Sequence, residues 1–192
     1  MLGTGADVTI GTKSFTSGAV LKGSGVAVTA GNAADNQVTF TGGSNTYVGG
    51  DGNETLISST GNDTISMGLG NDRVTDAGGA DTIDLGAGDD TLTVTPDANA
   101  DTITLGTGND RVVFSGPVLA SHIGTIDGGD GTDTLVVSSS SDLSGYDLVD
   151  VERIVYGSPD GSTVTIGLSS EQLNGLSGFE YVRVMLTDGG AV

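Results

Sequence analysis

An acidic residue recurs every nine positions through the middle of the chain, and this period constrains the fold more than any other feature. The steps are nine residues long except for one of eleven, and the series is Asp63, Asp72, Asp81, Asp90, Asp101 and Asp110. Two positions after each comes an aliphatic residue, namely Ile65, Val74, Ile83, Leu92, Ile103 and Val112. A fixed short period is typical of repeat architectures, in which each unit buries its apolar face against its neighbours.

Each unit joins a glycine-rich half-turn to a strand of about three residues. Because side chains alternate along a strand, the pattern predicts these inward pairs: Ile65 with Met67, Ile83 with Leu85, Leu92 with Val94, Ile103 with Leu105, and Val112 with Phe114. Two units, or 18 residues, can close one flattened coil, and successive coils then pair as parallel strands. The sequence therefore predicts an all-β parallel solenoid.

In an 18-residue coil, every second turn stacks on the same edge. One edge then carries Glu54, Asp72, Asp90 and Asp110, and the other carries Asp63, Asp81 and Asp101. Neighbouring strands lie about 4.8 Å apart, so these carboxylates would repel one another without a cation between them. Ca²⁺ takes oxygen ligands from carboxylates and carbonyls, whereas Mg²⁺ demands tighter geometry. We predict several Ca²⁺ ions, up to five, between the stacked turns.

The composition excludes several classes of protein. The chain has 25 acidic and 6 basic residues, a net charge of −19, and no cysteine. This balance argues against a nucleic-acid surface and against docking on anionic lipid, and the missing cysteines exclude disulfides and thiolate sites. No apolar run reaches the roughly 18 residues of a membrane span, so we expect no membrane insertion. Glycine-rich acidic disorder is the alternative, but disorder does not require periodic apolar residues.

The repeat divides the chain into three regions. The rhythm continues backwards through Leu56, Tyr47 and Val38, while the acidic position weakens. After residue 138 the rhythm is lost, and two longer related stretches follow at 143–156 and 173–186. We predict degenerate solenoid coils or a cap over 1–48, a calcium-binding β-roll over 49–137, and a larger-coil β cap over 138–192. A small separate β domain is the alternative for the last region.

The unit resembles the nonapeptide GGxGxDxUx of RTX (hemolysin-type calcium-binding) proteins. GGDGTDTLV at 128–136 matches in full, and GLGNDRV, GAGDDTL and GTGNDRV match without the first glycine. The resemblance implies a right-handed parallel β-roll with calcium in its turns, which folds outside the cell and often leaves by type I secretion. It implies carboxylate ligands at Asp63, Asp72, Asp81, Asp90, Asp101, Asp110 and Asp133. It also implies carbonyl ligands at Gly68, Gly70, Gly86, Gly88, Gly106 and Gly108.

Nothing in the sequence favours catalysis. Ser121, His122 and Asp127 could form a triad by residue type, but the nucleophile motif G-x-S-x-G is absent. We interpret the only histidine as a loop residue and expect the protein not to be an enzyme. Arg73 and Arg111 follow ligand aspartates and should point outward, where surface ion pairs are the simplest role.

Two functions fit these features. The first is a non-enzymatic, extracellular, calcium-binding structural or adhesive protein, which associates with itself or other subunits in a surface layer, filament, adhesin or virion surface. The alternative is a calcium-dependent folding and secretion module of a larger RTX enzyme or toxin. The N-terminal sequence MLGTGADVTI lacks the regions of a classical signal peptide, so we expect export by a route that does not read the N-terminus.

Overall fold

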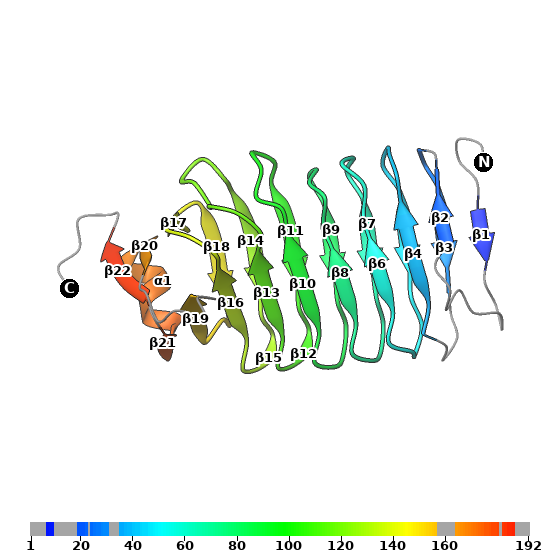
Figure 1. Ribbon diagram of the computed structural model, residues 1–192. Coiled ribbons are helices and arrows are strands. Elements are labelled where there is room, and N and C mark those ends of the chain that lie inside the picture. The colour runs from blue at the N-terminus through cyan, green and yellow to red at the C-terminus, as the bar shows by residue number, and fades with distance from the viewer. Residues whose placement is uncertain are drawn as a thin grey trace.

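A computed structural model describes residues 7–9, 19–22, 24–30, 35–156, 164–180 and 182–186. Over this part of the chain, short strands stack into an elongated β-solenoid whose coils follow one another from the N-terminal to the C-terminal end (Figure 1). Parts of both predicted end regions lie outside the described residues. No helix among the described residues is long and apolar enough to cross a membrane.

The solenoid has two parallel sheets, and the chain passes from one to the other at each turn. The eight-stranded sheet, called sheet A, contains β1 (Asp7–Thr9), β3 (Ala27–Thr29), β5 (Thr46–Val48), β7 (Thr64–Ser66), β9 (Thr82–Asp84), β11 (Asp101–Thr104), β14 (Gly124–Asp127) and β18 (Tyr146–Val149). The nine-stranded sheet B contains β2 (Ala19–Leu21), β4 (Gln37–Phe40), β6 (Thr55–Ile57), β8 (Arg73–Thr75), β10 (Thr91–Val94), β13 (Arg111–Phe114), β16 (Thr134–Val137), β19 (Arg153–Tyr156) and β21 (Gly178–Glu180).

Strand register confirms the 18-residue coil. Thr46 pairs with Thr64 and Thr64 with Thr82, each one coil further along sheet A, and every pairing is parallel. The two extra residues before Asp101 enlarge one turn without shifting the register, because Thr82 still pairs with Thr102. The longer connection at 115–123 is absorbed in the same way. Insertions therefore lie in turns, and the strands keep their inward faces.

The core is a set of columns that run along the solenoid between the two sheets. All ten residues predicted to point inward are buried, with at most 1% of their surface exposed. Burying an aliphatic side chain of this size contributes roughly 1.5–3 kcal/mol, and each coil adds several. One inward column of sheet B also contains polar side chains, namely Ser58 and Asp76. The full column is Phe40, Ser58, Asp76, Val94 and Phe114, and all five side chains are buried.

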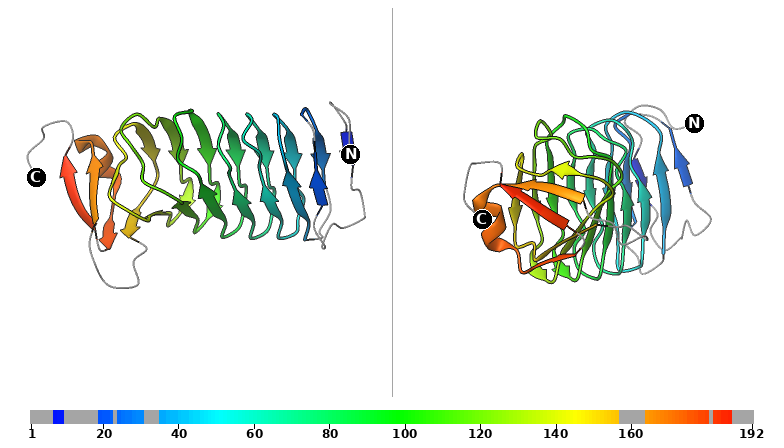
Figure 2. Two further views of the ribbon diagram at one scale, coloured as in Figure 1. Left: turned by 45° about the horizontal axis from the view of Figure 1, so that its top comes forward. Right: turned by 60° about the vertical axis from the view of Figure 1, so that its left-hand side comes forward.

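The C-terminal region continues the solenoid before it changes character. Strand β18 pairs with β14 and β19 with β16, so residues 146–156 extend both sheets, and β21 extends sheet B once more. A separate three-stranded parallel sheet lies at this end of the solenoid. It is made of β17 (Ser141–Asp142), which precedes β18 in the chain, β20 (Val164–Leu168) and β22 (Val182–Leu186). Figure 2 shows this sheet turned away from the regular coils at that end.

A short helix makes the prediction of a purely β end incomplete. Helix α1 (Ser170–Gly175) begins with a capping box, in which the Ser169 side chain accepts the Gln172 N–H and the Gln172 side chain accepts the Ser169 N–H. The Gln172 amide also donates to the carbonyls of Leu143 and Tyr146 at 2.8 and 2.7 Å. The capping box starts a helix at the point where the alternating strand pattern stops. The hydrogen bonds of Gln172 hold this helix against the last regular coils.

Candidate calcium-binding turns

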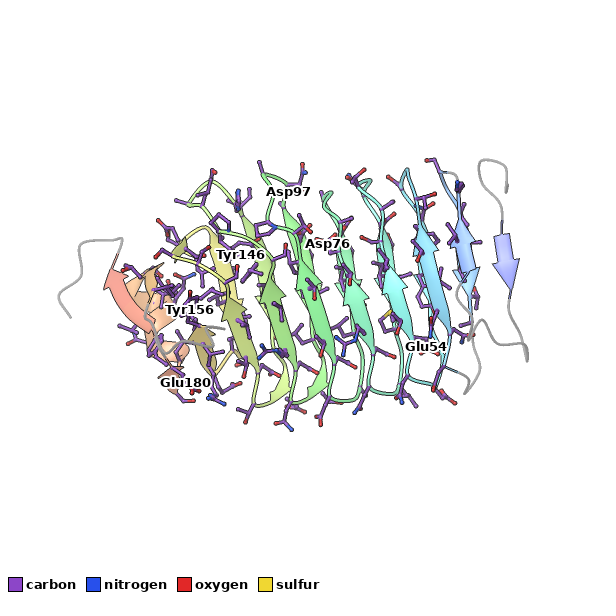
Figure 3. All side chains as sticks on the ribbon, in the orientation of Figure 1. Glu54, Asp76, Asp97, Tyr146, Tyr156 and Glu180 are labelled. Atoms are coloured by element: carbon purple, nitrogen blue, oxygen red, sulfur yellow. The ribbon has the colours of Figure 1, made fainter. Side chains whose placement is uncertain are left out.

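The turns lie on two edges of the solenoid. Turns that lead from sheet A to sheet B form the AB edge, and those that lead from sheet B to sheet A form the BA edge. Figure 3 shows Glu54 toward the AB edge, and Asp76 and Asp97 toward the BA edge. The predicted aspartates fall on these edges in the two expected columns, and Asp133 joins the AB column.

Hydrogen bonds tie the AB column together. One carboxylate oxygen in each coil accepts the backbone N–H at the equivalent position of the preceding coil. The bonds are Glu54 N to Asp72 at 2.6 Å, Asp72 N to Asp90 at 2.6 Å, Asp90 N to Asp110 at 2.7 Å, Asp110 N to Asp133 at 2.8 Å, and Asp133 N to Glu152 at 2.7 Å. Glu152, which lies outside the nonapeptide repeats, therefore continues the column.

The second carboxylate oxygen along the AB column has no hydrogen-bond partner. It is buried and unpartnered at Glu54, Asp72, Asp90, Asp110 and Asp133. A buried polar atom without a partner is costly, and a buried charge is costlier unless it is paired or coordinates a metal. A row of such oxygens beside stacked backbone turns suits a hard cation. The residues present therefore fit calcium, although the ligand roles themselves stay predictions.

Glycines bring the turn backbones close enough to stack. Gly70, Gly88 and Gly108 have φ values of +114°, +140° and +138°, which L side chains rarely adopt. A Cβ on Gly88 would collide with the Gly70 carbonyl, and one on Gly108 with that of Gly88. The carbonyls of Gly68, Gly86 and Gly106 each accept one N–H from the next coil at 2.9 Å. A second lone pair on each of these oxygens remains available in principle.

Gly88→Ala should destabilise the protein strongly. The new Cβ would meet the Gly70 carbonyl in a backbone conformation that costs alanine about 1–3 kcal/mol by itself. We expect a loss of at least about 2 kcal/mol in the free energy of unfolding, measured by urea denaturation in calcium. Gly116→Ala is the matched control, because a Cβ there meets nothing within 4 Å. Equal effects of the two substitutions would contradict this account of the turns.

Burial alters the acidity of the AB column. Desolvation is the largest cause, and it raises the pKa of Asp90 to about 7 and that of Asp72 to about 6. It also raises the pKa of Glu54 to about 7, with the Asp72 charge as the next contribution. The pKa of Tyr47 is raised by burial and by these two carboxylates. Without a cation, these carboxyl groups therefore take up protons as the pH falls from about 7, well above the range of exposed carboxyl groups.

The BA column is less uniform. The Asp63 carboxylate accepts the Asn45 N–H at 2.6 Å and the N–H and hydroxyl of Ser59 at 2.9 and 3.0 Å. The protein thus already satisfies both oxygens of Asp63, which fits a metal less well than its AB counterparts. Asp81 accepts the Asp63 N–H, and Asp101 accepts the Asp81 N–H. On this edge, Asp81 is the predicted ligand that keeps a buried unpartnered oxygen.

A third column lies outside the buried ones and was not predicted. The side-chain oxygen of Asn53 accepts the N–H of Asn71, that of Asn71 accepts the N–H of Asp89, and that of Asp89 accepts the N–H of Asn109, at 2.7–3.0 Å. In this exposed column the side chain accepts an N–H from the next coil, whereas in the buried column the side chain accepts an N–H from the preceding coil. The signal was present in the sequence, since Asn or Asp precedes each AB aspartate from position 71 to 110.

Other candidate residues remain apart from these turns. His122 is buried in a loop, where its Nδ1 accepts the Leu119 N–H at 3.3 Å, while Ser121 is exposed. Arg73 and Arg111 are exposed, but neither forms the expected ion pair among the described residues. Nor do three or more His, Asp or Glu side chains converge as a metal cluster in the described part of the chain. Calcium would therefore need backbone carbonyls beside the paired carboxylates.

Comparison with known proteins agrees with this geometry. The RTX calcium-binding nonapeptide repeat matches four segments, at residues 48–74, 68–92, 97–114 and 125–143. No curated protein and no solved structure gave a significant match. RTX nonapeptide repeats bind calcium, and their β-roll is a structural motif rather than a catalytic one. The matched segments include both columns of aspartates and the glycine turns between them, so this part of the chain consists of RTX (hemolysin-type) calcium-binding repeats.

Proposed function

We propose that this is a non-enzymatic extracellular protein whose solenoid becomes rigid on binding calcium and acts as a structural or adhesive subunit of a surface assembly. The observation that carries the proposal is the AB column, with its continuous series of buried, unpartnered carboxylate oxygens. Such a column is costly without cations and stable with them, which suits a protein that folds where calcium is abundant. Several ions per chain would bind in the stacked turns.

Self-association is supported by the distribution of positive charge. The chain has only six basic residues, and three of them, Arg73, Arg111 and Arg153, fall in one row across sheet B. Thr91 lies between the first two and Thr134 between the last two. The three arginines thus recur every second strand, with their backbones about 10 Å apart, and Arg153 also pairs with Glu180 at 3.3 Å. An acidic second copy is a complementary partner for such a row.

Replacing this row should weaken association. In calcium and at low ionic strength, we expect the protein to sediment as dimers or larger species. The double variant Arg73→Gln with Arg111→Gln should shift it toward monomer, by roughly 2- to 30-fold in the dissociation constant, because an exposed charge pair contributes only about 0.2–1 kcal/mol. Lys22→Gln is the matched control, since it removes an exposed positive charge outside the row.

Sedimentation also separates the proposal from its alternative. A calcium-loaded protein that stays monomeric at all concentrations would contradict the assembly role. If the parent gene also continued into a catalytic domain, the solenoid would instead be a folding and secretion module of a larger RTX protein. Calcium binding by the turns would stand in either case.

A further inference from the structure

Asp76 occupies a place in the hydrophobic core that the repeat gives to an apolar side chain. It points inward immediately after β8, in the column that also contains Ser58 and Val94. The equivalent positions after the sheet A strands are filled by Met67, Leu85 and Leu105, which are fully buried. Asp76 itself is only 1% exposed. A carboxylate in such a position must be neutralised by a proton or by a cation.

Only one of the two Asp76 carboxylate oxygens has hydrogen-bond partners in the protein. One oxygen of Asp76 accepts the Gly78 N–H at 2.9 Å and the Ser58 hydroxyl at 3.2 Å. The other oxygen is buried and has no partner. Asp81, at the far end of the same turn, also has one buried unpartnered oxygen. Among the described residues, these two are the BA-edge carboxylates that share this property.

The two carboxyl groups lie within hydrogen-bonding reach of each other. Two ionised carboxylates are both acceptors and cannot bond directly, so a proton or a cation must lie between them. The turn also offers a carbonyl on the same side. A Cβ on Gly79 would lie 2.5 Å from the Gly61 oxygen and 3.0 Å from an Asp81 oxygen. The Asp81 oxygen in question is the one that accepts the Asp63 N–H, so glycine at position 79 leaves room for the Gly61 carbonyl beside the Asp81 carboxylate.

We propose that Asp76 and Asp81 together hold one divalent cation of the calcium class inside the BA edge. Asp81 is the aspartate of the repeat, and Asp76 adds a carboxylate at a position where the nonapeptide pattern places none. The turn 76–81 lacks the glycine spacing of its AB counterparts, and the additional carboxylate compensates by supplying ligand oxygens directly. Ca²⁺ takes 6–8 oxygens and tolerates irregular geometry, so carbonyls and water can complete its shell. Asp97 of the next coil covers the turn from outside, where it accepts the Gly79 N–H at 3.0 Å. This proposal depends on the turns of the protein binding calcium at all.

Calcium stoichiometry tests the site directly. We expect Asp76→Asn to lose one bound ion per chain in equilibrium dialysis, while the remaining ions bind as in the wild type. Asp84→Asn is the matched control, because it removes the same charge from an exposed position on β9 and should keep every ion. An Asp76→Asn protein that binds as many ions as the wild type would overturn the proposal and assign a shared proton to the pair.

A second measurement reports on the location. Tyr146 lies near enough to Asp101, Asp97 and Asp76 for their charges to contribute to raising its pKa, after burial, so it should sensitise the luminescence of Tb³⁺ bound there. Asp76→Asn and Tyr146→Phe should each remove that fraction of the tyrosine-excited signal, and Asp84→Asn should not. If the wild type itself bound no calcium, the proposed function would fail first. If the wild type bound calcium and Asp76→Asn left the stoichiometry and this signal unchanged, only the present inference would fail.

Discussion

Removing calcium should abolish most of the β-sheet circular dichroism of this protein, or lower its melting temperature by tens of degrees. Two like charges about 5 Å apart repel by roughly 3 kcal/mol at an effective dielectric constant near 20, and the AB column repeats this contact from coil to coil. A ligand at about 100 times its dissociation constant stabilises the folded state by roughly 2.7 kcal/mol per site. Four sites would contribute roughly 10 kcal/mol, or about 20–40 °C for a chain of this size.

The measurement is a thermal melt followed by circular dichroism, with calcium and then with excess EGTA. Magnesium at the same concentration should restore little of the loss, because Mg²⁺ holds its water and demands octahedral geometry. Adding calcium back should recover the signal, which separates metal loss from aggregation. Melting curves that coincide with and without chelator would show that the unpartnered oxygens are not metal ligands.

The pH dependence of stability should reverse when calcium is removed. In calcium-stripped protein, the carboxyl groups of the AB column bind protons more tightly when folded, since burial raises the pKa of Glu54 and Asp90 to about 7 and that of Asp72 and Asp110 to about 6. Where the folded state binds more protons, stability falls as the pH rises. The metal-free protein should therefore become more stable as the pH falls from about 7 to about 4. Below that range the unfolded chain is protonated too, and the gain ends.

With saturating calcium the order should be the opposite, because protons compete with the metal for the same oxygens. The test is a series of melts from pH 4.5 to pH 8 on stripped and calcium-loaded samples. Asp90→Asn supplies a control, since an asparagine oxygen can still accept the Asp72 N–H while the charge is gone. In stripped protein, this variant should melt above the wild type at pH 8 and close to it at pH 4.5. Parallel pH profiles for stripped and loaded protein would contradict the argument.

The period of the sequence was sufficient to predict the coil, because each unit repeats the same two constraints. Ile65 and Ile83 show which face of each strand points inward, and Asp63 and Asp81 mark the residue before each strand begins. The 18-residue spacing between equivalent residues therefore determines the strand register and the edge on which each aspartate lies. The two-residue insertion before Asp101 did not disturb this, since a turn can lengthen without moving the strands. The positions of the aspartates on two edges therefore followed from counting.

What the period could not show are features that depend on contacts between unlike units. Alternation along the strand predicts that Val94 and Phe114 point inward, but Asp76 in the same column is a carboxylate, so the apolar pattern did not mark it as buried. Glu152 joins the AB column 19 residues after Asp133, across a turn with no repeat sequence. Helix α1 had a recognisable capping box at Ser169 and Gln172, but six residues are too few for a helical period to be visible.

The two edges of this solenoid are chemically different, and that difference limits how the gene can change in length. Adding or removing 18 residues inserts or deletes a complete coil, so every downstream aspartate stays on its own edge. Adding or removing nine would move each later unit to the opposite edge, placing the turn that contains Asp76, with its adjacent Gly78 and Gly79, among AB turns whose glycines alternate with other residues. Although the repeat is nine residues long when written as a sequence, the smallest step by which such a protein can be lengthened by duplication is twice that.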